Sequence, residues 1–137
     1  DIGVLNKLNK SSGAISLHIH WDIPQDYTNI KSLANELDIK FDAVNSNTFQ
    51  DQPNSFHSYK FGSLSHIDAE VRKEAIQHNK EVIDHGVQLG SKALTVWLAD
   101  GSSFPGQHNF RGAFQRTLGS LEEIYDYLPS DWKLLIE

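Results

Sequence analysis

The sequence predicts an α/β fold, and more narrowly four consecutive βα units of a (β/α)8 TIM barrel. Strand-like and helix-like apolar patterns alternate along the chain, an order typical of a parallel sheet with right-handed crossovers. No glycine-rich phosphate-binding motif follows a predicted strand, which argues against a doubly wound nucleotide-binding sheet. A complete barrel takes about 250 residues, whereas the chain has 137. Residues 1–137 are therefore expected to be a fragment of a single catalytic barrel domain.

The first half of the chain is predicted to contain helix, strand, helix and strand. Apolar residues at helical spacing in 4–8 predict a helix that ends near 11–13. Strict alternation over 14–21 predicts a strand with one apolar face and one polar face. A short amphipathic helix follows over 30–37, and a second strand over 41–47 becomes polar at its end.

The middle of the chain contains a long segment without a regular period, residues 48–65. Such a loop within a compact domain is usually functional or disordered, and its four aromatic side chains argue against disorder. Ser65 and Asp68 have the spacing of a capping box, which predicts the start of the next helix. Apolar residues then continue at helical spacing to Gly90, the predicted end of this helix.

The last third of the chain is predicted to be strand, loop, helix and strand. Residues 93–98 form an apolar strand, and a loop that contains glycine and proline follows over 100–107. Large side chains at helical spacing over 110–125 predict a helix that is closed by Pro129. The fourth strand is expected over 133–137.

The composition limits the kinds of partner that the protein can have. The chain carries 12 basic and 18 acidic residues, a net charge of -6, without a block of either sign. Nucleic acid and membranes are not expected as partners, because each usually requires a basic face. The chain has no cysteine, so a metal site must use carboxylate, imidazole, amide and water ligands. No apolar run approaches the roughly 20 residues of a membrane span and no leader-like segment opens the chain, so we expect a soluble, cytoplasmic protein.

In a barrel of this kind the active site lies at the carboxyl ends of the strands. The predicted strand ends and the loop after the second strand supply His18, His20, Trp21, Asp22, Asn45, Asn47, His57, Lys60, Trp97, Asp100 and Glu137. All four predicted strands end in polar or aromatic groups. This is more than solvated turns alone would require, although turns also favour Asn and Asp. We therefore expect functional side chains in this set.

Several of these residues also have a simple structural interpretation. Asn45 and Asn47 are as compatible with turn or strand-capping roles as with function. His18 and His20 share one strand face, where we expect interior histidines that hydrogen-bond their neighbours. Asp22 stands before an Ile-Pro pair and is expected in a turn rather than at a metal.

The remaining candidates differ in how far the pattern alone supports a function. Trp97 is compatible with a core position. The other side chains on its strand face are small, however, and this suits a barrel interior in which only the top layer contains large side chains. His57 is one of seven histidines, and Lys60 is interpreted as a solvated loop charge. Three further histidines fall in helical stretches and are expected to be exposed: His66, His78 and His85. Glu137 ends an apolar strand, where a lone carboxylate is costly unless it is paired, hydrogen-bonded or bound to a cation.

Four longer motifs resemble a known family. The stretches "FDAVNSNTF", "HSYKFGSLSH", "ALTVWLADGSSFPGQHNF" and "LPSDWKLLIE" together resemble the L-rhamnose isomerases of the broad-specificity bacterial type, which are relatives of xylose isomerase. The resemblance extends from about Ile15 onward. It implies a (β/α)8 barrel of which this chain supplies roughly strands 2 to 5, a divalent-metal-dependent interconversion of aldoses and ketoses, and a homotetramer.

The resemblance also implies roles for three residues. Glu137 matches the first metal-binding carboxylate, at the end of the fifth barrel strand. Trp97 matches a tryptophan that lines the sugar pocket, and His57 matches a histidine that hydrogen-bonds the sugar and takes part in ring opening. Further ligands are expected beyond residue 137. The cofactor implied is a divalent metal, with Mn²⁺ the first expectation and Mg²⁺, Co²⁺ or Zn²⁺ as alternatives.

The expected function is the isomerisation of L-rhamnose to L-rhamnulose, with broader aldose specificity as an extension. One alternative is a metal-dependent hydrolase or phosphodiesterase on the same barrel, since fold does not determine function. Phosphate handling would bring arginines to the strand ends, yet the arginines fall in helices or helix starts: Arg72, Arg111 and Arg116. The other alternative is a non-catalytic sugar-binding or structural piece. Taken alone, residues 1–137 are expected to be inactive, because half a barrel has two open edges and an incomplete metal shell.

Overall fold

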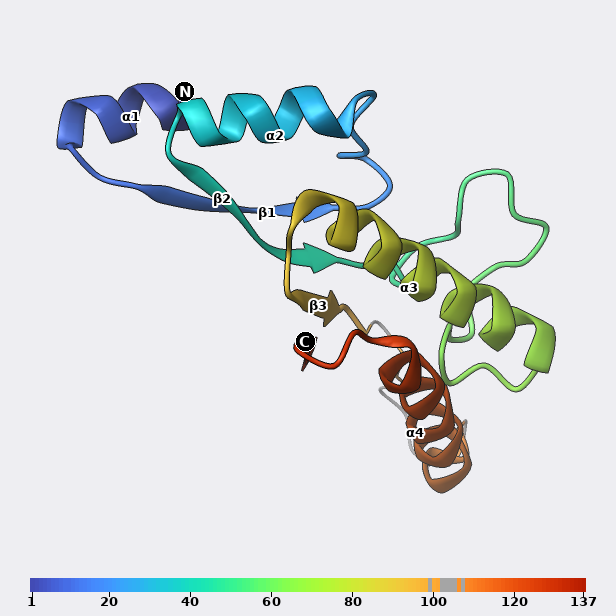
Figure 1. Ribbon diagram of the computed structural model, residues 1–137. Coiled ribbons are helices and arrows are strands. Elements are labelled where there is room, and N and C mark those ends of the chain that lie inside the picture. The colour runs from blue at the N-terminus through green and yellow to red at the C-terminus, as the bar shows by residue number, and fades with distance from the viewer. Residues whose placement is uncertain (99, 102–105, 107) are drawn as a thin grey trace.

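A computed structural model describes residues 1–98, 100–101, 106 and 108–137 (Figure 1). The helices are α1 (Ile2–Asn9), α2 (Tyr27–Glu36), α3 (Ala69–Leu89) and α4 (Phe110–Tyr127). The strands are β1 (Gly13–His18), β2 (Ile39–Asn45), β3 (Ala93–Val96) and β4 (Lys133–Ile136). This order of helices and strands confirms the predicted order, with boundaries that differ by a few residues.

The strands form one parallel sheet in the order β1-β2-β3-β4. At the carboxyl ends, Asn45 is the register partner of both His18 in β1 and Thr95 in β3. Val96 in β3 is paired in the same way with Ile136 in β4. A helix connects each strand to the next, so the chain repeats one βα unit across the sheet (Figure 1). The α/β class with a parallel sheet is therefore confirmed.

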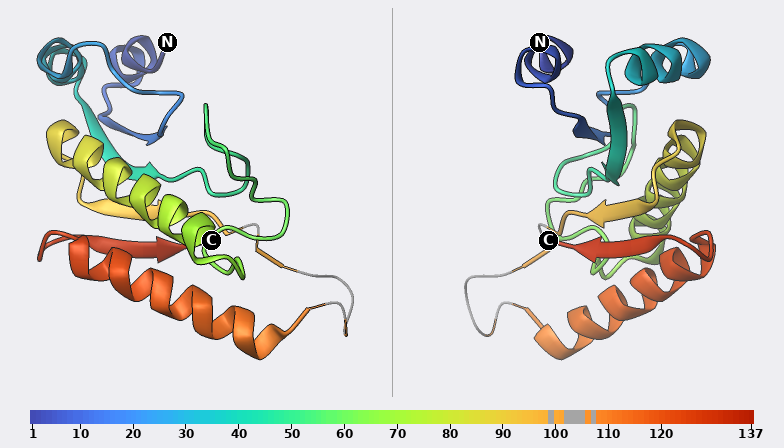
Figure 2. Two further views of the ribbon diagram at one scale, coloured as in Figure 1. Left: turned by 90° about the vertical axis from the view of Figure 1, so that its right-hand side faces the viewer. Right: turned by 60° about the vertical axis from the view of Figure 1, so that its left-hand side comes forward.

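Helices α3 and α4 cover the same face of the sheet, as both views in Figure 2 show. The core lies between them and the strands. Val44, Leu94 and Val96 are each at most 1% exposed, and they belong to one cluster with Ile83 of α3 and Ile124 of α4. Because side chains alternate along a strand, the residues between these core positions point to the opposite face.

The start of α3 is set by a side-chain cap. The Asp68 carboxylate accepts a hydrogen bond from the backbone N–H of Glu70, so Asp68 caps α3. The prediction that Ser65 caps this helix is wrong. The backbone N–H of Ser65 instead donates to the Asp100 carboxylate at 2.7 Å, which fixes Ser65 in a turn that precedes the helix.

The first strand is shorter than the alternation over 14–21 predicts. β1 ends at His18, and Asp22 closes the chain back onto it: the Asp22 N–H donates to the His18 carbonyl at 2.9 Å. The Asp22 carboxylate accepts the His18 backbone N–H at 2.8 Å. Asp22 is thus the turn residue that was expected. Trp21 lies in this turn and is 52% exposed, instead of continuing the apolar strand face.

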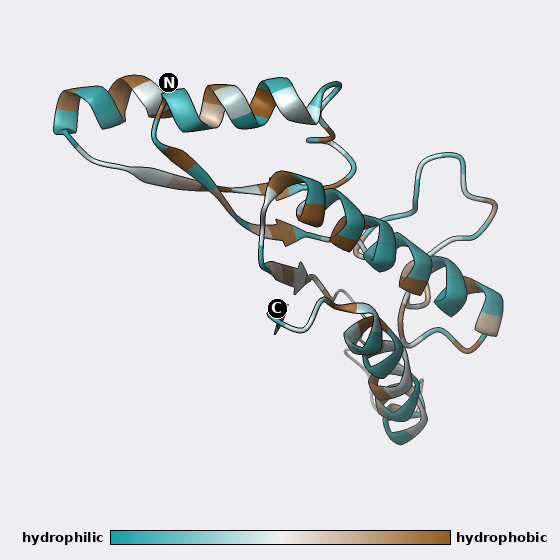
Figure 3. Cartoon of the chain, in the orientation of Figure 1, coloured by the Kyte–Doolittle hydropathy of each residue, from teal (hydrophilic) through white to brown (hydrophobic). Residues whose placement is uncertain are grey.

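The helices are amphipathic, with hydrophilic and hydrophobic residues on different sides in Figure 3. The predicted end of α3 at Gly90 is confirmed, and Gly90 has a φ of 85°, which glycine adopts without strain. The prediction that the last helix closes before Pro129 is also confirmed, with α4 ending at Tyr127. Among the described residues, no helix combines the length and the apolar character that crossing a membrane requires.

Apolar side chains are exposed near both outer strands of the sheet. Near β1 they belong to α1 and are Ile2, Val4, Leu5 and Leu8. Near β4 they belong to α4 and to β4 itself and are Phe110, Phe114, Leu118, Leu135 and Ile136. In a barrel, further βα units would pack against these two surfaces.

Candidate active site

Four side chains lie at the carboxyl edge of the sheet on the face that points away from α3 and α4. We call them the inner row: His18, Asn45, Trp97 and Glu137. Leu17 and Val44, which directly precede the first two members, pack in the core on the helix side. Since side chains alternate along a strand, His18 and Asn45 point the other way. All four come from strand ends, where barrels place their active sites.

Asn45 links three strands at the centre of the inner row. Its side-chain amide donates to the Leu17 carbonyl at 3.2 Å. Its amide oxygen accepts the indole N–H of Trp97 at 3.3 Å. The residue is buried, so these hydrogen bonds are made away from bulk water. Asn45 therefore does not lie in a turn. It ends β2, binds a backbone carbonyl of β1 and orients the indole of Trp97.

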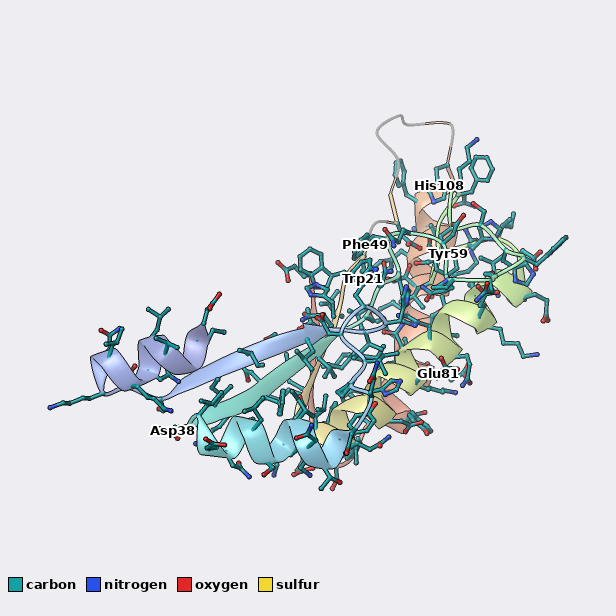
Figure 4. The ribbon with its side chains drawn as sticks, turned by 90° about the horizontal axis from the view of Figure 1, so that it is seen from above. Trp21, Asp38, Phe49, Tyr59, Glu81 and His108 are labelled. Atoms are coloured by element: carbon teal, nitrogen blue, oxygen red, sulfur yellow. The ribbon has the colours of Figure 1, made fainter. Side chains whose placement is uncertain are left out.

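Aromatic rings surround Trp97. The His18 ring lies edge-on to it, with centroids 5.7 Å apart, and the Phe49 ring lies 6.0 Å away. Trp21 completes the group, with its ring 6.0 Å from His18 and 6.1 Å from Phe49. Figure 4 shows Trp21 and Phe49 close together beyond the ends of the strands. This arrangement forms an apolar wall beside the inner row.

Sequence reasoning missed Phe49 as a member of this wall. It counted Phe49 only among the aromatic residues of the long loop, because nothing in the local pattern shows where a loop side chain packs. The signal that could have identified it is its position two residues after Asn47, directly beyond a strand end.

His57 is held by a carboxylate from a helix that is remote in sequence. Its Nδ1 lies 2.7 Å from Oε2 of Glu74 in α3, and the two side chains are 33% and 27% exposed. The hydroxyl of Ser55 accepts the backbone N–H of His57 at 2.8 Å, which fixes the loop on the other side. The pair orients the ring, with Nδ1 toward the Glu74 carboxylate and Nε2 on the opposite side.

Sequence reasoning also missed Glu74. A glutamate on a helix is ordinarily a solvated charge, and no short-range spacing connects it with His57. In the structure the Oε1 atom of Glu74 is buried, and no described residue hydrogen-bonds it. Burial and the charge of Glu74 both raise the pKa of the nearby Tyr59 phenol. Tyr59 therefore stays protonated at neutral pH.

A cavity of about 350 Å³ lies between α3 and the loops that follow β1 and β2. Its polar lining includes His20, Glu74, Gln77, His78 and Glu81. The His20 ring lies 6.0 Å from His78 and faces this cavity, whereas His18 belongs to the inner row. The structure thus separates two histidines that the sequence assigns to one strand face.

His78 is buried, which corrects the expectation that this helical histidine is exposed. Only 6% of its surface is accessible, and its Nε2 accepts the backbone N–H of Asn47 at 3.0 Å. Burial, and then the neighbouring His20 and His85, lower the pKa of His78 to about 4. His78 is therefore a neutral group that fixes the end of β2. His85 is half-buried beneath Tyr27, and His66 is half-buried ahead of α3, so neither matches the predicted exposure.

Asn47 lies two residues after Asn45, the last residue of β2, and differs from it. Its backbone is held by His78, but its side-chain amide is fully buried, and no described residue hydrogen-bonds either amide atom. Its burial excludes a role in a solvated turn. We assign Asn47 no contact with the inner row.

Asp100 and two arginines hold the turn that precedes α3. The Asp100 carboxylate accepts the Ser63 backbone N–H and hydroxyl at 2.8 and 2.6 Å. Arg72 donates to the His66 carbonyl at 2.6 Å, and Arg116 donates to the Ser65 carbonyl at 2.6 Å. These guanidinium groups serve the backbone, which argues against a phosphate site built on them. Lys60 is exposed above the Phe61 ring, in keeping with the absence of an assigned role.

Glu137 lies beside Trp97 on the neighbouring strand. Its backbone N–H donates to the Val96 carbonyl at 3.0 Å, and its carbonyl accepts the Leu98 N–H at 2.8 Å. Ile136 before it borders an apolar cavity against α4, so the alternation places Glu137 on the inner face. The structure brings Trp97 and Glu137 together, whereas His57 hydrogen-bonds neither of them.

The described residues do not by themselves complete a metal centre. No group of three or more His, Asp or Glu side chains among them has an arrangement that could hold a metal ion. Glu137 is an exposed carboxylate and supplies one oxygen-donor group, whereas divalent cations of the kind expected here take several ligands. A centre that uses Glu137 would therefore need donors other than a His, Asp or Glu cluster of the described residues.

The chain is similar along its whole length to two probable sugar isomerases. It is 51% identical to one from Rhizobium meliloti and 50% identical to one from Mesorhizobium japonicum, over 137 residues in each comparison. These alignments cover 100% of this chain and 32% of each relative, so the chain spans about a third of their length. The chain matches no protein-family model.

Solved structures share the fold at low sequence identity. A D-tagatose 3-epimerase-like protein has a TM-score of 0.63 at 15% identity, covering 96% of this chain and 46% of that protein. An L-ribulose 3-epimerase has a TM-score of 0.64 at 14% identity, covering 96% and 41%. A xylose isomerase domain protein from Planctomyces limnophilus has a TM-score of 0.56 at 11% identity, covering 98% and 48%. At these identities the likeness concerns the fold, and it agrees with βα units from part of a TIM barrel.

Proposed function

We propose that this chain forms part of the active site of a metal-dependent aldose–ketose isomerase, within a polypeptide of the length of its relatives. The observation that supports the proposal is the inner row, in which Glu137 and Trp97 are neighbours on adjacent strand ends at the carboxyl edge of a parallel sheet. Similarity to two probable sugar isomerases supports the same class of reaction.

The proposed chemistry moves a hydrogen between C1 and C2 of an open-chain sugar, and the side chains take separate roles. The indole of Trp97, oriented by Asn45 and flanked by Phe49, excludes water from the reacting carbons. His57 transfers the ring hydroxyl proton when the sugar opens, because an imidazole accepts and releases protons near neutral pH. Glu74 holds the Nδ1 side of His57, so Nε2 is the atom that exchanges the proton.

Glu137 is proposed as one ligand of a divalent metal, completed by donors outside this chain. When bound, such a metal polarises two neighbouring sugar oxygens. Oxygen and nitrogen donors favour Mn²⁺, Mg²⁺ or Co²⁺ over metals that need thiolate, and Zn²⁺ is a further alternative. We propose Mn²⁺ as the first metal to supply.

We propose L-rhamnose as the first substrate to test, with L-rhamnulose as its product, because the motifs of the chain resemble L-rhamnose isomerases. Broader aldose specificity, a homotetrameric assembly and a cytoplasmic location belong to the same proposal. A phosphodiesterase is less well supported, because Arg72 and Arg116 bind backbone carbonyls in the turn before α3.

The test is an isomerisation assay on the full-length polypeptide that contains this chain. The protein is stripped with chelator, resupplied with Mn²⁺, and assayed for ketose formation from L-rhamnose. We expect activity that the metal restores and that Glu137→Gln lacks. Glu122→Gln, which removes an exposed carboxylate of α4, is the control and should retain activity. Absence of activity on L-rhamnose and on other aldoses would refute the isomerase proposal.

A further inference from the structure

We propose that the cavity beside α3 is a second binding site, which takes a neutral polyhydroxy compound, a sugar or a sugar alcohol. The groups that contact the hydroxyls of this compound are His20, Glu74 and His78, which all line the cavity. No member of the inner row lines it. The inference therefore goes beyond the proposed function and does not require isomerase activity.

The cavity has the size and the mixed lining of a small-molecule site. Its volume is about 350 Å³, at the lower end of the range of about 300–1,000 Å³ that ligand pockets occupy. Ile19, Ile23 and Pro53 give it an apolar side, which suits the C–H face of a sugar. None of the described residues that line it is Lys or Arg, so an anionic ligand would find no compensating positive charge there.

His78 offers the cavity a hydrogen-bond donor. It lines the cavity and is 6% exposed, and its Nε2 accepts the backbone N–H of Asn47. In a neutral imidazole whose one nitrogen accepts, the other nitrogen carries the proton. Nδ1 of His78 is therefore a donor, and no described residue accepts its proton. Because an unpaired donor at so buried a position costs free energy, an acceptor atom of a ligand is favoured here.

His20 and Glu74 bring further hydrogen-bonding groups to the same cavity. The His20 ring stands at 71° to the His78 ring, with centroids 6.0 Å apart. No described residue hydrogen-bonds either ring nitrogen of His20. The Glu74 carboxylate is paired with His57 through Oε2, and no described residue hydrogen-bonds Oε1, whereas a carboxylate can accept about four hydrogen bonds. Three groups with unused hydrogen-bonding capacity thus line one cavity.

This combination of donor and acceptor groups selects hydroxyls. A hydroxyl donates one hydrogen bond and accepts others, so a polyol can accept from His78 and donate to Glu74. An ammonium group offers His78 no acceptor, and an ionised carboxylate has no hydrogen for Glu74 and is repelled by it. A divalent cation is disfavoured as well, because no group of three or more His, Asp or Glu among the described residues could hold one.

The test is saturation-transfer NMR, which detects weak ligand binding, on the full-length polypeptide that contains this chain. The protein carries Glu137→Gln and is treated with chelator, which removes metal-dependent binding at the inner row. D-sorbitol and L-rhamnose are the polyhydroxy probes, and putrescine is the cationic probe. We expect a polyhydroxy probe to bind and putrescine not to bind. The tighter of the two polyhydroxy probes identifies the ligand as a sugar alcohol or a sugar.

Two variants locate the binding in the cavity. His20→Phe keeps a ring against His78 and removes both polar atoms, so the dissociation constant should rise about five- to tenfold. Ile23→Trp should abolish binding, because it fills the cavity from a residue that is 43% exposed and does not belong to the core. His108→Phe is the matched control for His20→Phe. His108 does not line this cavity, so the control should bind the probes as the parent protein does.

Three outcomes would overturn the inference. They are absence of binding by both polyhydroxy probes, equal binding by His20→Phe, Ile23→Trp and the parent protein, and preferential binding of putrescine. The isomerisation assay is a separate measurement on the wild-type protein. Its failure would refute the proposed function and leave a measured cavity site intact, and loss of the cavity site would leave the isomerase proposal intact.

Discussion

At the scale of single residues, the polar side chains of the candidate site are positioned by partners on other strands or helices. Asn45 is the clearest example, because its amide joins the carbonyl of one strand to the indole of another. Removal of a buried amide leaves the donors and acceptors that it served without partners, and this costs more than the bond itself contributes.

Replacement of Asn45 by leucine should destabilise the protein by about 1–3 kcal/mol, because the Trp97 N–H and the Leu17 carbonyl both lose their partner. Urea unfolding of the full-length polypeptide measures the change. Asn35→Leu, on the exposed surface of α2, is the control and should change stability by no more than about 0.5 kcal/mol. Equal stability of both variants would show that the amide does not hold the inner row together.

Replacement of Glu74 by glutamine should slow the isomerisation of ring-forming sugars, because the imidazole of His57 loses the charged partner of its Nδ1. His57→Asn sets the upper limit, a loss of about 10²–10⁴-fold in kcat. Glyceraldehyde cannot close to a five- or six-membered ring, so its isomerisation should be spared. Glu81→Gln is the control. It removes a carboxylate that, like that of Glu74, lines the cavity beside α3, and it should behave as wild type. Equal slowing on glyceraldehyde would exclude a role in ring opening.

His78 should make the protein less stable in acid. Its pKa is lowered to about 4 from an ordinary value of 6.5, so between these values the unfolded chain binds more protons than the folded one. Stability is fully present above about pH 6.5 and is lost as pH falls toward 4, by about 3 kcal/mol in total. Urea unfolding of wild type and His78→Gln from pH 7 to 4.5 measures this. The variant should show a smaller slope, and equal slopes would contradict the assignment.

At the scale of elements, α3 packs closely on the sheet at Gly86. Gly86 of α3 faces Val44 and Trp132, and a Cβ added there would lie 2.7 Å from a Val44 methyl and 2.6 Å from the Trp132 ring. The absence of a side chain lets this helix approach the sheet. The same approach positions Glu74 and His78 on the helix face that meets the loops.

Gly86→Ala should therefore destabilise the protein by about 1–3 kcal/mol through overpacking, although alanine is the better helix former. Gly119 in α4 provides the matched comparison, because a Cβ added there meets nothing within 4 Å. Gly119→Ala should increase stability by up to about 1 kcal/mol. Thermal unfolding of both variants decides the matter, and stabilisation by both substitutions would show that α3 does not depend on close packing at Gly86.

At the scale of the whole molecule, the chain leaves apolar surface exposed at both outer strands. The side chains concerned lie on α1 at one end and on α4 and β4 at the other. Exposed apolar patches of this kind are typical of surfaces that pack against another part of a protein. The inner row is also open, with Glu137 exposed at its end.

Expressed alone, residues 1–137 should associate through these surfaces and should neither isomerise sugars nor bind metal tightly. Light scattering measures the association, and calorimetric titration with Mn²⁺ measures the metal affinity. A monomeric fragment that binds one equivalent of metal tightly would contradict both expectations, and it would show that the described residues complete a centre on their own.

The order of strands and helices, the parallel α/β class and the position of Trp97 at a strand end were determined by the sequence alone. These features follow from local periodicity, which a strand or helix imposes on its own residues. Gly90 and Pro129 also marked helix ends locally, because glycine and proline act through their own backbone conformation. The boundary errors at Ser65 and Trp21 arose where a carboxylate, Asp100 or Asp22, binds backbone groups that the predicted helix or strand would have used.

Only the tertiary structure decided which of the polar residues work together. The pairing of His57 with Glu74, the burial of His78 and the contact of Asn45 with Trp97 join residues that are 17 or more positions apart. No short-range pattern encodes such contacts, because they depend on how the helices pack on the sheet. The separation of His18 from His20 has the same cause: β1 ends at His18, and the chain turns there to bring one ring to the inner row and the other to α3.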